Sequence, residues 1–302
     1  MANLREIQKR KDSVSTTKQI TRTMEMVSSA KISRALARAQ KSEPYRAAIT
    51  DVMLTVAGDI ESHEDSPLLE NPESYDRALV IAVSSDRGLA GGFNTQVARA
   101  TEERIDHFHR HGAREVELIT CGRKVSEHFS GYPNVVMRVV DESDSPTLER
   151  AQMIADYVLD SFGSGKLGRI DIIHFHAKNR VEQVLREERI LPLDPMAIQS
   201  SHGPRTDKSG PKRLSSSFEY APSADHVLRK LIPSYVLTVV HQALIDSAAA
   251  EHGARRKAMH SATENATEII DSLNRTYNRV RQASITTEIN EIVGGAAALE
   301  EY

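Results

Sequence analysis

The sequence holds a single cysteine, Cys121, among its 302 residues, and it holds no tryptophan. One cysteine excludes both an internal disulfide and a zinc site built from cysteines. Aromatic residues make up only 5% of the chain, which disfavours a platform for stacking the bases of single-stranded nucleic acid. Since 39% of the residues are apolar and 27% are charged, the composition is typical of a globular protein with a core.

Long apolar runs are missing as well. No run approaches the roughly 18 residues that a membrane-spanning helix needs. The first residues, MANLREIQKRKDS, are charged from the start and lack the apolar centre of a signal peptide. They also carry acids within a helical pattern, which is not typical of a transit peptide. We therefore expect the protein to stay in the compartment where it is made.

Negative charge is scarce in the first part of the chain. The net charge is −3, yet residues 1–50 hold eleven Lys and Arg against four acids. Such asymmetry indicates nucleic acid, an anionic surface or an acidic protein as partner, or simply a solvated basic helix face. We favour the solvated face and expect no binding of nucleic acid. A basic coiled coil that binds DNA stays an alternative, and its affinity would fall with salt.

Glycine and proline are absent from Met1 to Glu43. Pro44 interrupts this segment, after which a helical pattern resumes until Gly58. The pattern predicts one long helix with a kink allowed at Pro44. Its apolar residues follow one another at three, four, six or seven positions, and steps of three and four are typical of a helical stripe. They are Leu4, Ile7, Val14, Ile20, Met24 and Val27.

The segment between Pro233 and Gly294 contains only Gly253 as a breaker. If most of it is helical, the rod is roughly 90 Å long at about 1.5 Å per residue, longer than a domain of this size. We expect part of it to find its contacts on other chains. Its apolar seam has the spacing of a coiled coil, with Met259, Thr263, Ala266, Ile270, Leu273, Tyr277 and Val280. The phase then slips to Ile285, Ile289, Ile292 and Ala296.

The centre of the chain alternates between short β-branched runs and helical segments. ALVIAVSS, VELITCG, NVVMRVV and RIDIIHFHA predict strands, and helical segments separate them. This alternation implies a parallel sheet covered on both faces. Residues 199–217 are polar and rich in Gly, Pro and Ser, which predicts a flexible loop. Ser223 or Asp225 is expected to cap the last helix.

The expected fold class is α/β. An antiparallel coiled coil of long N- and C-terminal helices carries an inserted Rossmann-like α/β domain. The pairing of the two helices is inferred from the apolar stripe that each must bury. The predicted segments are an N-terminal coiled-coil helix, the α/β domain, a flexible loop with a foot, and a C-terminal coiled-coil helix, at residues 1–58, 75–195, 196–222 and 223–302.

A glycine-rich turn, SSDRGLAGGFN at residues 84–94, follows the first predicted strand and raises the question of a phosphate site. Ala90 stands where a dinucleotide fingerprint needs its second glycine, and no GK[ST] follows. We favour a structural turn. His107 and His111 lie four residues apart but lack an evident third metal ligand. The sequence therefore predicts no catalytic, cofactor-binding or metal site. The alternative is a nucleotide-dependent α/β enzyme that dimerises through its long helices.

Two further polar sets have simpler interpretations. His174 and His176 point the same way from a predicted strand, and without a nucleophile motif they are interpreted as strand residues. Asp141 and Asp144 are interpreted as solvated loop acids.

Residues 13–32 (SVSTTKQITRTMEMVSSAKI), 85–94 (SDRGLAGGFN) and 277–299 (YNRVRQASITTEINEIVGGAAAL) resemble the gamma subunit of F-type ATP synthases. The last segment is close to the family's C-terminal signature. The resemblance implies a central rotor stalk that needs no cofactor, present as a single copy in the complex. Its partners would be the alpha and beta subunits, the epsilon subunit and the c-ring. It would lie at the cytoplasmic face of the cell membrane, peripheral to it.

The resemblance also implies partner contacts at particular residues. Contacts with the alpha/beta ring fall on Met24, Glu25, Val27, Arg255, Arg281, Gln282, Thr286 and Glu288. Contacts on the side of the membrane ring and epsilon fall on Phe218 and Tyr220. Arg256 stands where relatives usually keep an apolar methionine, and Ala221 stands where an acid is common.

Overall fold

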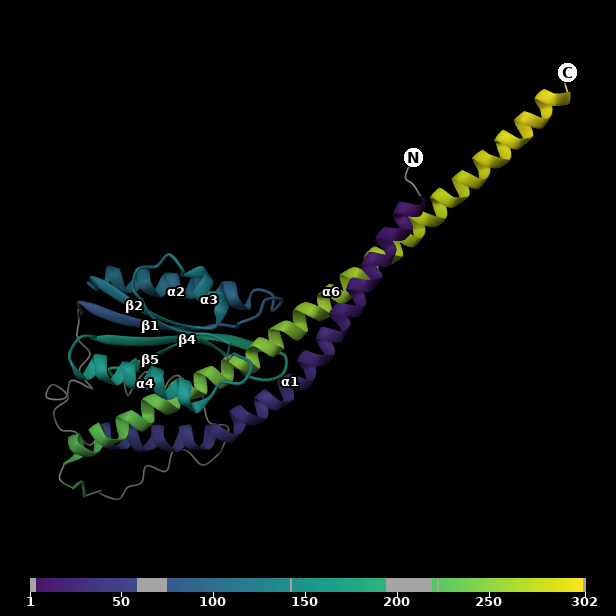
Figure 1. Ribbon diagram of the computed structural model, residues 1–302. Coiled ribbons are helices and arrows are strands. Elements are labelled where there is room, and N and C mark those ends of the chain that lie inside the picture. The colour runs from purple at the N-terminus through teal and green to yellow at the C-terminus, as the bar shows by residue number, and fades with distance from the viewer. Residues whose placement is uncertain (1–3, 59–74, 142, 194–218, 222, 301–302) are drawn as a thin grey trace. The chain divides into compact units, whose positions relative to one another are not determined.

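The computed structural model describes residues 4–58, 75–141, 143–193, 219–221 and 223–300, with side chains described as far as residue 296 (Figure 1). The predicted loop at 199–217 and Phe218 lie outside the described residues. The elements run, in chain order, as α1 (Leu4–Gly58), β1 (Arg77–Val83), α2 (Phe93–Arg110), β2 (Glu115–Cys121), α3 (Arg123–His128), β3 (Val135–Val139), α4 (Leu148–Gly163), β4 (Arg169–Ala177), β5 (Gln183–Leu191) and α6 (Ala224–Glu300).

Both end helices form as the lack of breakers predicts. α1 spans 55 residues with Pro44 inside it, and α6 spans 77 residues with Pro233 inside it. Ser223 takes the capping position, since its Oγ accepts a hydrogen bond from the backbone N–H of His226 at 3.3 Å. Asp225 instead pairs with Arg229 at 2.8 Å.

By packing, the chain divides into two compact units. Unit 1 combines residues 1–28 with residues 255–302, and unit 2 comprises residues 29–254. The two long helices therefore contribute to both units. The four segments predicted from the sequence stay a prediction.

Unit 2 is built on a five-stranded sheet of order β3-β2-β1-β4-β5 (Figure 1). The first four strands in this order are parallel, as the alternation predicts, whereas β5 runs antiparallel to β4. β5 was not among the predicted strands. Its sequence, QVLREERIL, is mostly charged and polar, and it lacks the β-branched run that marks the other strands.

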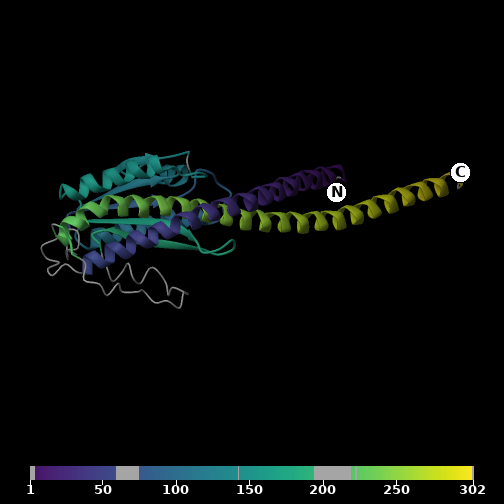
Figure 2. The same ribbon diagram turned by 90° about the horizontal axis from the view of Figure 1, so that it is seen from below.

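The sheet is covered on both faces, as expected. Alternate residues of β1 enter two separate cores, with Leu79 and Ile81 in one and Val80 in the other. The first core is shared with α1, α4 and α6, and the second is formed mainly with α2 and α3; Figures 1 and 2 show these helices on their two sides of the sheet. Each fully buried large apolar side chain contributes about 1.5–3 kcal/mol relative to an exposed one.

Unit 1 is an antiparallel pair of helices. Thr21 contacts Thr263, and Glu25 contacts His260, so the numbers rise along α1 as they fall along α6. In α1 the side chains of Ile7, Thr21 and Ser28 are buried at multiples of seven residues, the repeat of a coiled coil. The seam predicted for α6 is confirmed, because all of its members are buried or half-buried.

The predicted stripe of α1 is wrong in its later part. Ile20 and Val27 are 55% and 51% exposed, while their neighbours Thr21 and Ser28 occupy the seam. A seven-residue repeat that starts at Ile7 reaches Thr21 and Ser28, so geometry favours these small polar residues over the adjacent apolar ones. Ile20 and Val27 consequently form part of the outer surface of unit 1.

Candidate partner interface

The last part of α6 is the most exposed helical segment of unit 1. Every described side chain from Arg281 to Ala296 is exposed except Ser284, which is half-buried. The described part of α1 begins at Leu4, which lies near Tyr277. Figures 1 and 2 show α6 continuing past the N-terminal end of α1. The seam therefore ends at about Val280, and the helix goes on without α1 beside it.

This exposed segment has an apolar face, which we call the terminal stripe: Ile285, Ile289, Ile292 and Ala296. Its isoleucines are 47%, 53% and 71% exposed. Because each residue turns an α-helix by about 100°, the four side chains share one face. Apolar side chains gathered in this way usually mark a binding surface.

The terminal stripe is not a continuation of the seam. Extending the seven-residue repeat from Tyr277 and Val280 leads to Ser284 and Thr287, which are polar. Ile285 follows Ser284 directly, so the stripe is turned by about 100° from the face that meets α1. The slip in phase noted in the sequence therefore marks the point where the apolar face of α6 turns away from α1.

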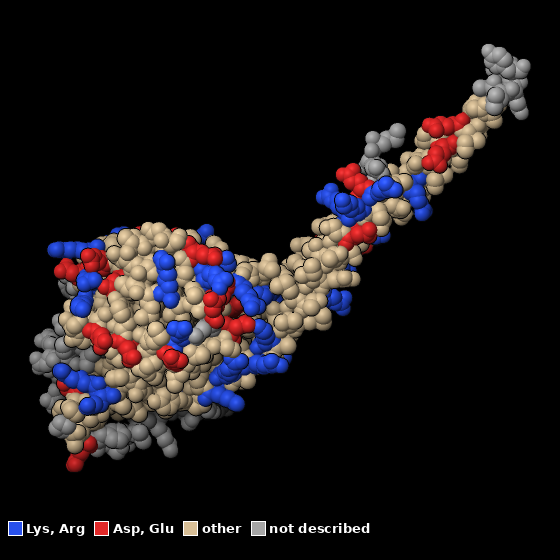
Figure 3. Space-filling model, in the orientation of Figure 1, with Lys and Arg blue, Asp and Glu red and all other residues tan. Residues whose placement is uncertain are grey.

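Four of the predicted contact residues flank the terminal stripe. By helical position, Arg281 and Glu288 lie along one side of it, and Gln282 and Thr286 lie along the other. The Thr286 hydroxyl donates to the backbone oxygen of Gln282 at 2.9 Å. Figure 3 shows isolated charged side chains on otherwise uncharged surface in this part of α6.

On α1, the three predicted contact residues differ in accessibility. Met24 and Glu25 are half-buried, and the Glu25 carboxylate lies 3.0 Å from Nδ1 of His260. Val27 is exposed and shares a face with the exposed Ile20 and the half-buried Met24, and we call these three residues the α1 stripe. Sequence periodicity assigned this stripe to the seam, whereas the seven-residue repeat from Ile7 and the partner contacts implied by the resemblance for Met24 and Val27 indicate an outer face.

The other predicted contact residues lie elsewhere. Arg255 is 7% exposed, which leaves little of it accessible to a partner, and Arg256 is half-buried. In unit 2, Tyr220 is half-buried and packs against the core that α1, α4 and α6 share, while Ala221 is exposed. Phe218 cannot be placed, because it lies outside the described residues.

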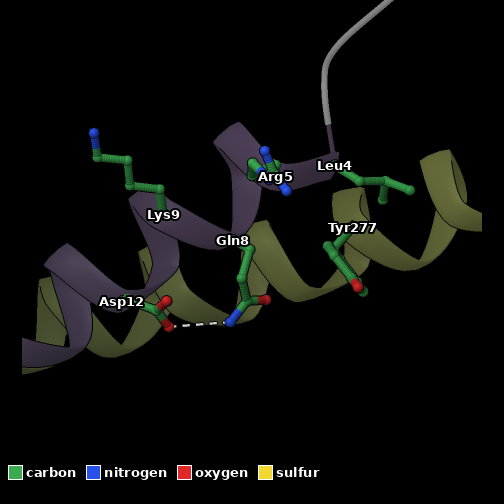
Figure 4. A pocket seen from close by; sticks show the side chains of 6 residues that line it. All are labelled: Leu4, Arg5, Gln8, Lys9, Asp12 and Tyr277. Atoms are coloured by element: carbon green, nitrogen blue, oxygen red, sulfur yellow. Dashed lines mark hydrogen bonds between the residues drawn. The ribbon is translucent and has the colours of Figure 1, made fainter.

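A shallow groove occurs where the described part of α1 begins. It encloses about 420 Å³ and is lined by Leu4, Arg5, Gln8, Lys9, Asp12 and Tyr277 (Figure 4). The amide of Gln8 donates to the Asp12 carboxylate at 3.0 Å. Lys9 adds an exposed positive charge at its rim, which suits an acidic group rather than a basic one.

The glycine-rich turn is engaged in internal hydrogen bonds. The Asp86 carboxylate accepts the backbone N–H groups of Arg123, Asp141 and Ser143 at 2.9, 3.0 and 2.9 Å. Burial raises the pKa of Asp86, but these backbone hydrogen bonds outweigh burial and hold its pKa below the ordinary value. An ionised carboxylate at the end of β1 disfavours a bound phosphate by charge repulsion.

The rest of this turn also serves the fold. The Ser85 hydroxyl and backbone N–H both donate to the Asn94 side chain, at 2.8 and 3.0 Å. Gly122 has φ +100°, and a Cβ there would lie 2.5 Å from the backbone oxygen of Ser84. The turn therefore ties β1 to α2 and to the end of β2.

The four histidines that the sequence analysis singled out are packed or paired with neighbouring side chains rather than arranged as a metal site. Among the described residues, no cluster of three or more His, Cys, Asp or Glu side chains could hold a metal ion. His107 and His111 stack at 4.0 Å between ring centroids. His174 is fully buried in β4, and His176 lies 2.7 Å from the Asp246 carboxylate.

The two loop acids are ion-paired, which corrects their interpretation as simply solvated. Asp141 pairs with Arg123. Asp144 pairs with Lys31 and lies 3.1 Å from Nε2 of His252. The pairs of Asp141 with Arg123 and of Asp144 with Lys31 join residues 18 and 113 positions apart, beyond the range of helix or strand periodicity.

Comparison with known proteins agrees with this fold. A solved chain from the Euglena gracilis mitochondrial ATP synthase aligns with a TM-score of 0.66 at 17% identity, covering 98% of this chain and 94% of that one. A chain from the Tetrahymena thermophila mitochondrial ATP synthase, in a structure titled central stalk/c-ring, aligns with a TM-score of 0.60 at 20% identity, covering 80% and 99%. Both likenesses show the fold: an α/β sheet domain combined with long terminal helices.

The sequence comparisons are more specific. The family model described as ATP synthase matches residues 3–299. The ATP synthase gamma chain of Flavobacterium psychrophilum is 36% identical over 300 residues, which cover 99% of this chain and 100% of the relative. The chain belongs to the family of ATP synthase gamma chains. The resemblance seen in the sequence is thereby confirmed.

Proposed function

We propose that this chain is the central rotor shaft of a membrane ATP synthase. It turns as a single copy inside a ring of alpha and beta subunits and transmits torque between that ring and the ion-driven c-ring. Through this coupling it regulates ATPase activity and proton flow. The observation that carries the proposal is the terminal stripe, an apolar face at the end of a 77-residue helix, turned away from the seam with α1. Membership of the gamma-chain family supports it.

The chain is the non-catalytic subunit of the complex. The turn most like a nucleotide site carries the Asp86 carboxylate, engaged by three backbone N–H groups. No described helix is both long enough and apolar enough to cross a membrane. We place the chain at the cytoplasmic face of the cell membrane, peripheral to it.

The exposed faces of unit 1 contact the alpha/beta ring. The terminal stripe provides apolar contact, and Arg281 offers a planar donor fork that suits a carboxylate. Gln282, Thr286 and Glu288 supply polar contacts beside it. On α1, Met24 and Val27 offer apolar surface to a beta subunit. Glu25 on α1 and Arg255 on α6 are further proposed contacts with the ring, but Glu25 also pairs with His260 and Arg255 is only 7% exposed.

Part of unit 2 serves the membrane side. Tyr220 and Phe218 belong to the segment that approaches the c-ring, and the inserted sheet domain carries the epsilon subunit. Tyr220 supports this assignment only in part, since it also packs into the core of unit 2.

Reconstitution tests the proposal. The purified chain alone should show no ATPase activity, and with alpha and beta subunits it should restore coupled activity. Exchanging both Arg281→Ala and Gln282→Ala should weaken coupling or assembly. A matched control exchanges Thr287→Ala and Asn290→Ala, on the face opposite the terminal stripe, and should leave both unchanged. Wild-type coupling in the first variant contradicts the assigned contacts, and specific binding of ATP or NAD to the isolated chain favours an enzyme instead.

A further inference from the structure

The loop that follows β3 is joined to both long helices within unit 2. The Asp144 carboxylate pairs with Nζ of Lys31 on α1, and its Oδ1 lies 3.1 Å from Nε2 of His252 on α6. The next residue, Ser145, accepts a hydrogen bond from Nη1 of Arg38 at 3.1 Å. Lys31 and Arg38 are seven residues apart, so both point to the loop from one face of α1. Two consecutive loop residues therefore engage two helices.

The same loop is attached to the sheet by Asp86. Its carboxylate accepts the N–H groups of Asp141 and Ser143, and its own N–H donates to the Ser143 hydroxyl at 3.0 Å. Residues 143–145 thus form a short connection, which we call the clasp, from the carboxyl ends of the strands to α1 and α6. The glycine-rich turn at 84–94 provides the sheet end of this connection.

The clasp differs in kind from the apolar cores that also join the helices to the sheet. Apolar burial is non-directional, so it resists separation of two surfaces more than it resists sliding. Hydrogen bonds and close ion pairs depend on both distance and angle, so they resist sliding as well. His252 is buried, which reduces screening of its interaction with Asp144 by solvent.

Within the clasp, the surroundings of Asp144 favour its ionised form. Burial raises the pKa of Asp144, but the hydrogen bond from Lys31 and the charge of His252 outweigh burial and hold its pKa below the ordinary value. Asp144 is therefore ionised while the protein works, and its contacts are charge-assisted.

We propose that the clasp transmits torque between the paired helices of unit 2 and the inserted sheet domain. The proposal rests on the rotor function proposed above. Asp144 and Lys31 are its positioning residues, since they fix the angle of the sheet domain on the helices and touch no substrate. Asp86 holds the loop in the shape that this contact needs.

The test measures torsional stiffness in the assembled complex. The full chain is combined with alpha and beta subunits, the ring is fixed to a surface, and a probe on the exposed side of α2 at Glu103 reports angular fluctuations without nucleotide. Asp144→Asn keeps the shape of the side chain and removes its charge, while Lys31→Met keeps the aliphatic stem. Each should increase the angular variance by about 1.5-fold or more, and the double variant should add little, because both remove one interaction.

Asp141→Asn is the matched control. It removes the ion pair with Arg123 in the same loop, and asparagine tolerates the φ of +66° at this position. It should keep the wild-type variance. All variants should hydrolyse ATP at the wild-type rate, which separates a torsional role from a merely structural one.

Two results overturn the clasp. One is wild-type variance in both Asp144→Asn and Lys31→Met; the other is failure of both variants to assemble, which would make the contact a requirement of folding. If only Asp144→Asn fails to assemble, the angular variance of the Lys31→Met complex decides whether the clasp transmits torque. Failure of the unaltered chain to assemble or rotate contradicts the rotor function instead, so the two proposals are separable.

Discussion

The helices α1 and α6 contribute a seam to each unit, and the two seams differ in chemistry. In unit 2 the seam is mainly apolar, with Ile49 and Met53 of α1 in the same core as Val236 and Val240 of α6, beside one hydrogen bond from Ser42 to Gln242. In unit 1 much of it is small or polar, as in the 2.8 Å contact between the hydroxyls of Thr21 and Thr263. One helix pair thus combines two modes of association.

Because of this difference in chemistry, the two seams contribute differently to stability and to the alignment of the helices. A buried large apolar side chain contributes about 1.5–3 kcal/mol, whereas a hydrogen bond contributes about 0.5–1.5 kcal/mol net. The seam of unit 2 therefore contributes more to the free energy of unfolding. Polar contacts within a coiled coil restrict which residues can face each other, so the seam of unit 1 contributes more to alignment.

The largest expected effect is in the apolar seam. Met53→Ala should lower the free energy of unfolding by about 2–5 kcal/mol, because it leaves a cavity in a close-packed core. Val52→Ala changes the next residue, which points outward, and should cost within about 0.5 kcal/mol. Urea denaturation followed by circular dichroism measures both. Equal losses would remove the contrast between the buried and outer faces of α1.

A second effect depends on pH and concerns His174, which is fully buried near Glu188, Asp246, Arg46 and Arg186. Burial lowers the pKa of His174 below its usual 6.5. The folded state then binds this proton less well than the unfolded state. His174 therefore does not reduce the free energy of unfolding above pH 6.5, and that free energy falls as the pH drops below 6.5. The loss should be at most about 1.4 kcal/mol per pH unit from this residue.

Denaturation at several pH values between 7.5 and 5 checks this dependence. His174→Leu should make the curve flatter, and His109→Gln, which changes an exposed histidine of α2, should not. A slope that is unchanged in His174→Leu would assign the pH dependence to other groups. Among the described residues, the seam of unit 1 holds no fully buried histidine, so this source of pH dependence belongs to unit 2.

The polar seam should respond less. Thr21→Val should cost about 0.5–1.5 kcal/mol, because the hydroxyl of Thr263 loses a partner. Exchanging Thr263→Val as well should recover most of that loss, since two apolar groups of the same shape then face each other. A double-mutant cycle on the free energy of unfolding measures the coupling. Simple additivity of the two losses would show that the hydroxyls act independently.

The smallest effect on stability is expected in the terminal stripe. Ile289→Asp should change the free energy of unfolding by less than about 0.5 kcal/mol, because the side chain is exposed. It should nevertheless weaken binding to the alpha/beta ring, measured by co-purification, because it places a charge on the apolar contact face. Asn290→Asp adds the same charge on the far side of the helix and should bind normally. Equal binding by both variants would contradict the assigned face.

Sequence periodicity predicted those parts of the fold that depend on local spacing. The long helices follow from missing breakers, and the α6 seam follows from its steps of three and four residues. β5 could not be found in this way, because its charged residues are placed by distant partners, as Glu188 is by Arg46 at 3.3 Å. The α1 stripe was misassigned for a related reason: hydrophobicity alone does not tell a seam from a surface that awaits another chain.

In the candidate interface too, local sequence patterns predict some residues, whereas contacts between distant residues cannot be predicted from them. Arg281 and Gln282 were predicted as contacts because their segment resembles a known signature, and helical geometry places them beside the stripe; their role as contacts stays a prediction. The pairing of Asp144 with Lys31 joins residues 113 positions apart, and no periodicity spans such a distance.

Cys121, the single thiol, is buried at the end of β2, and burial raises its pKa to about 12. Since the thiolate is the reactive form, this sulfur is nearly inert to alkylating reagents at neutral pH while the fold is intact. A cysteine introduced at the surface would therefore be the sole chemical handle on the native protein. Modification of Cys121 itself would report, molecule by molecule, that the sheet has opened.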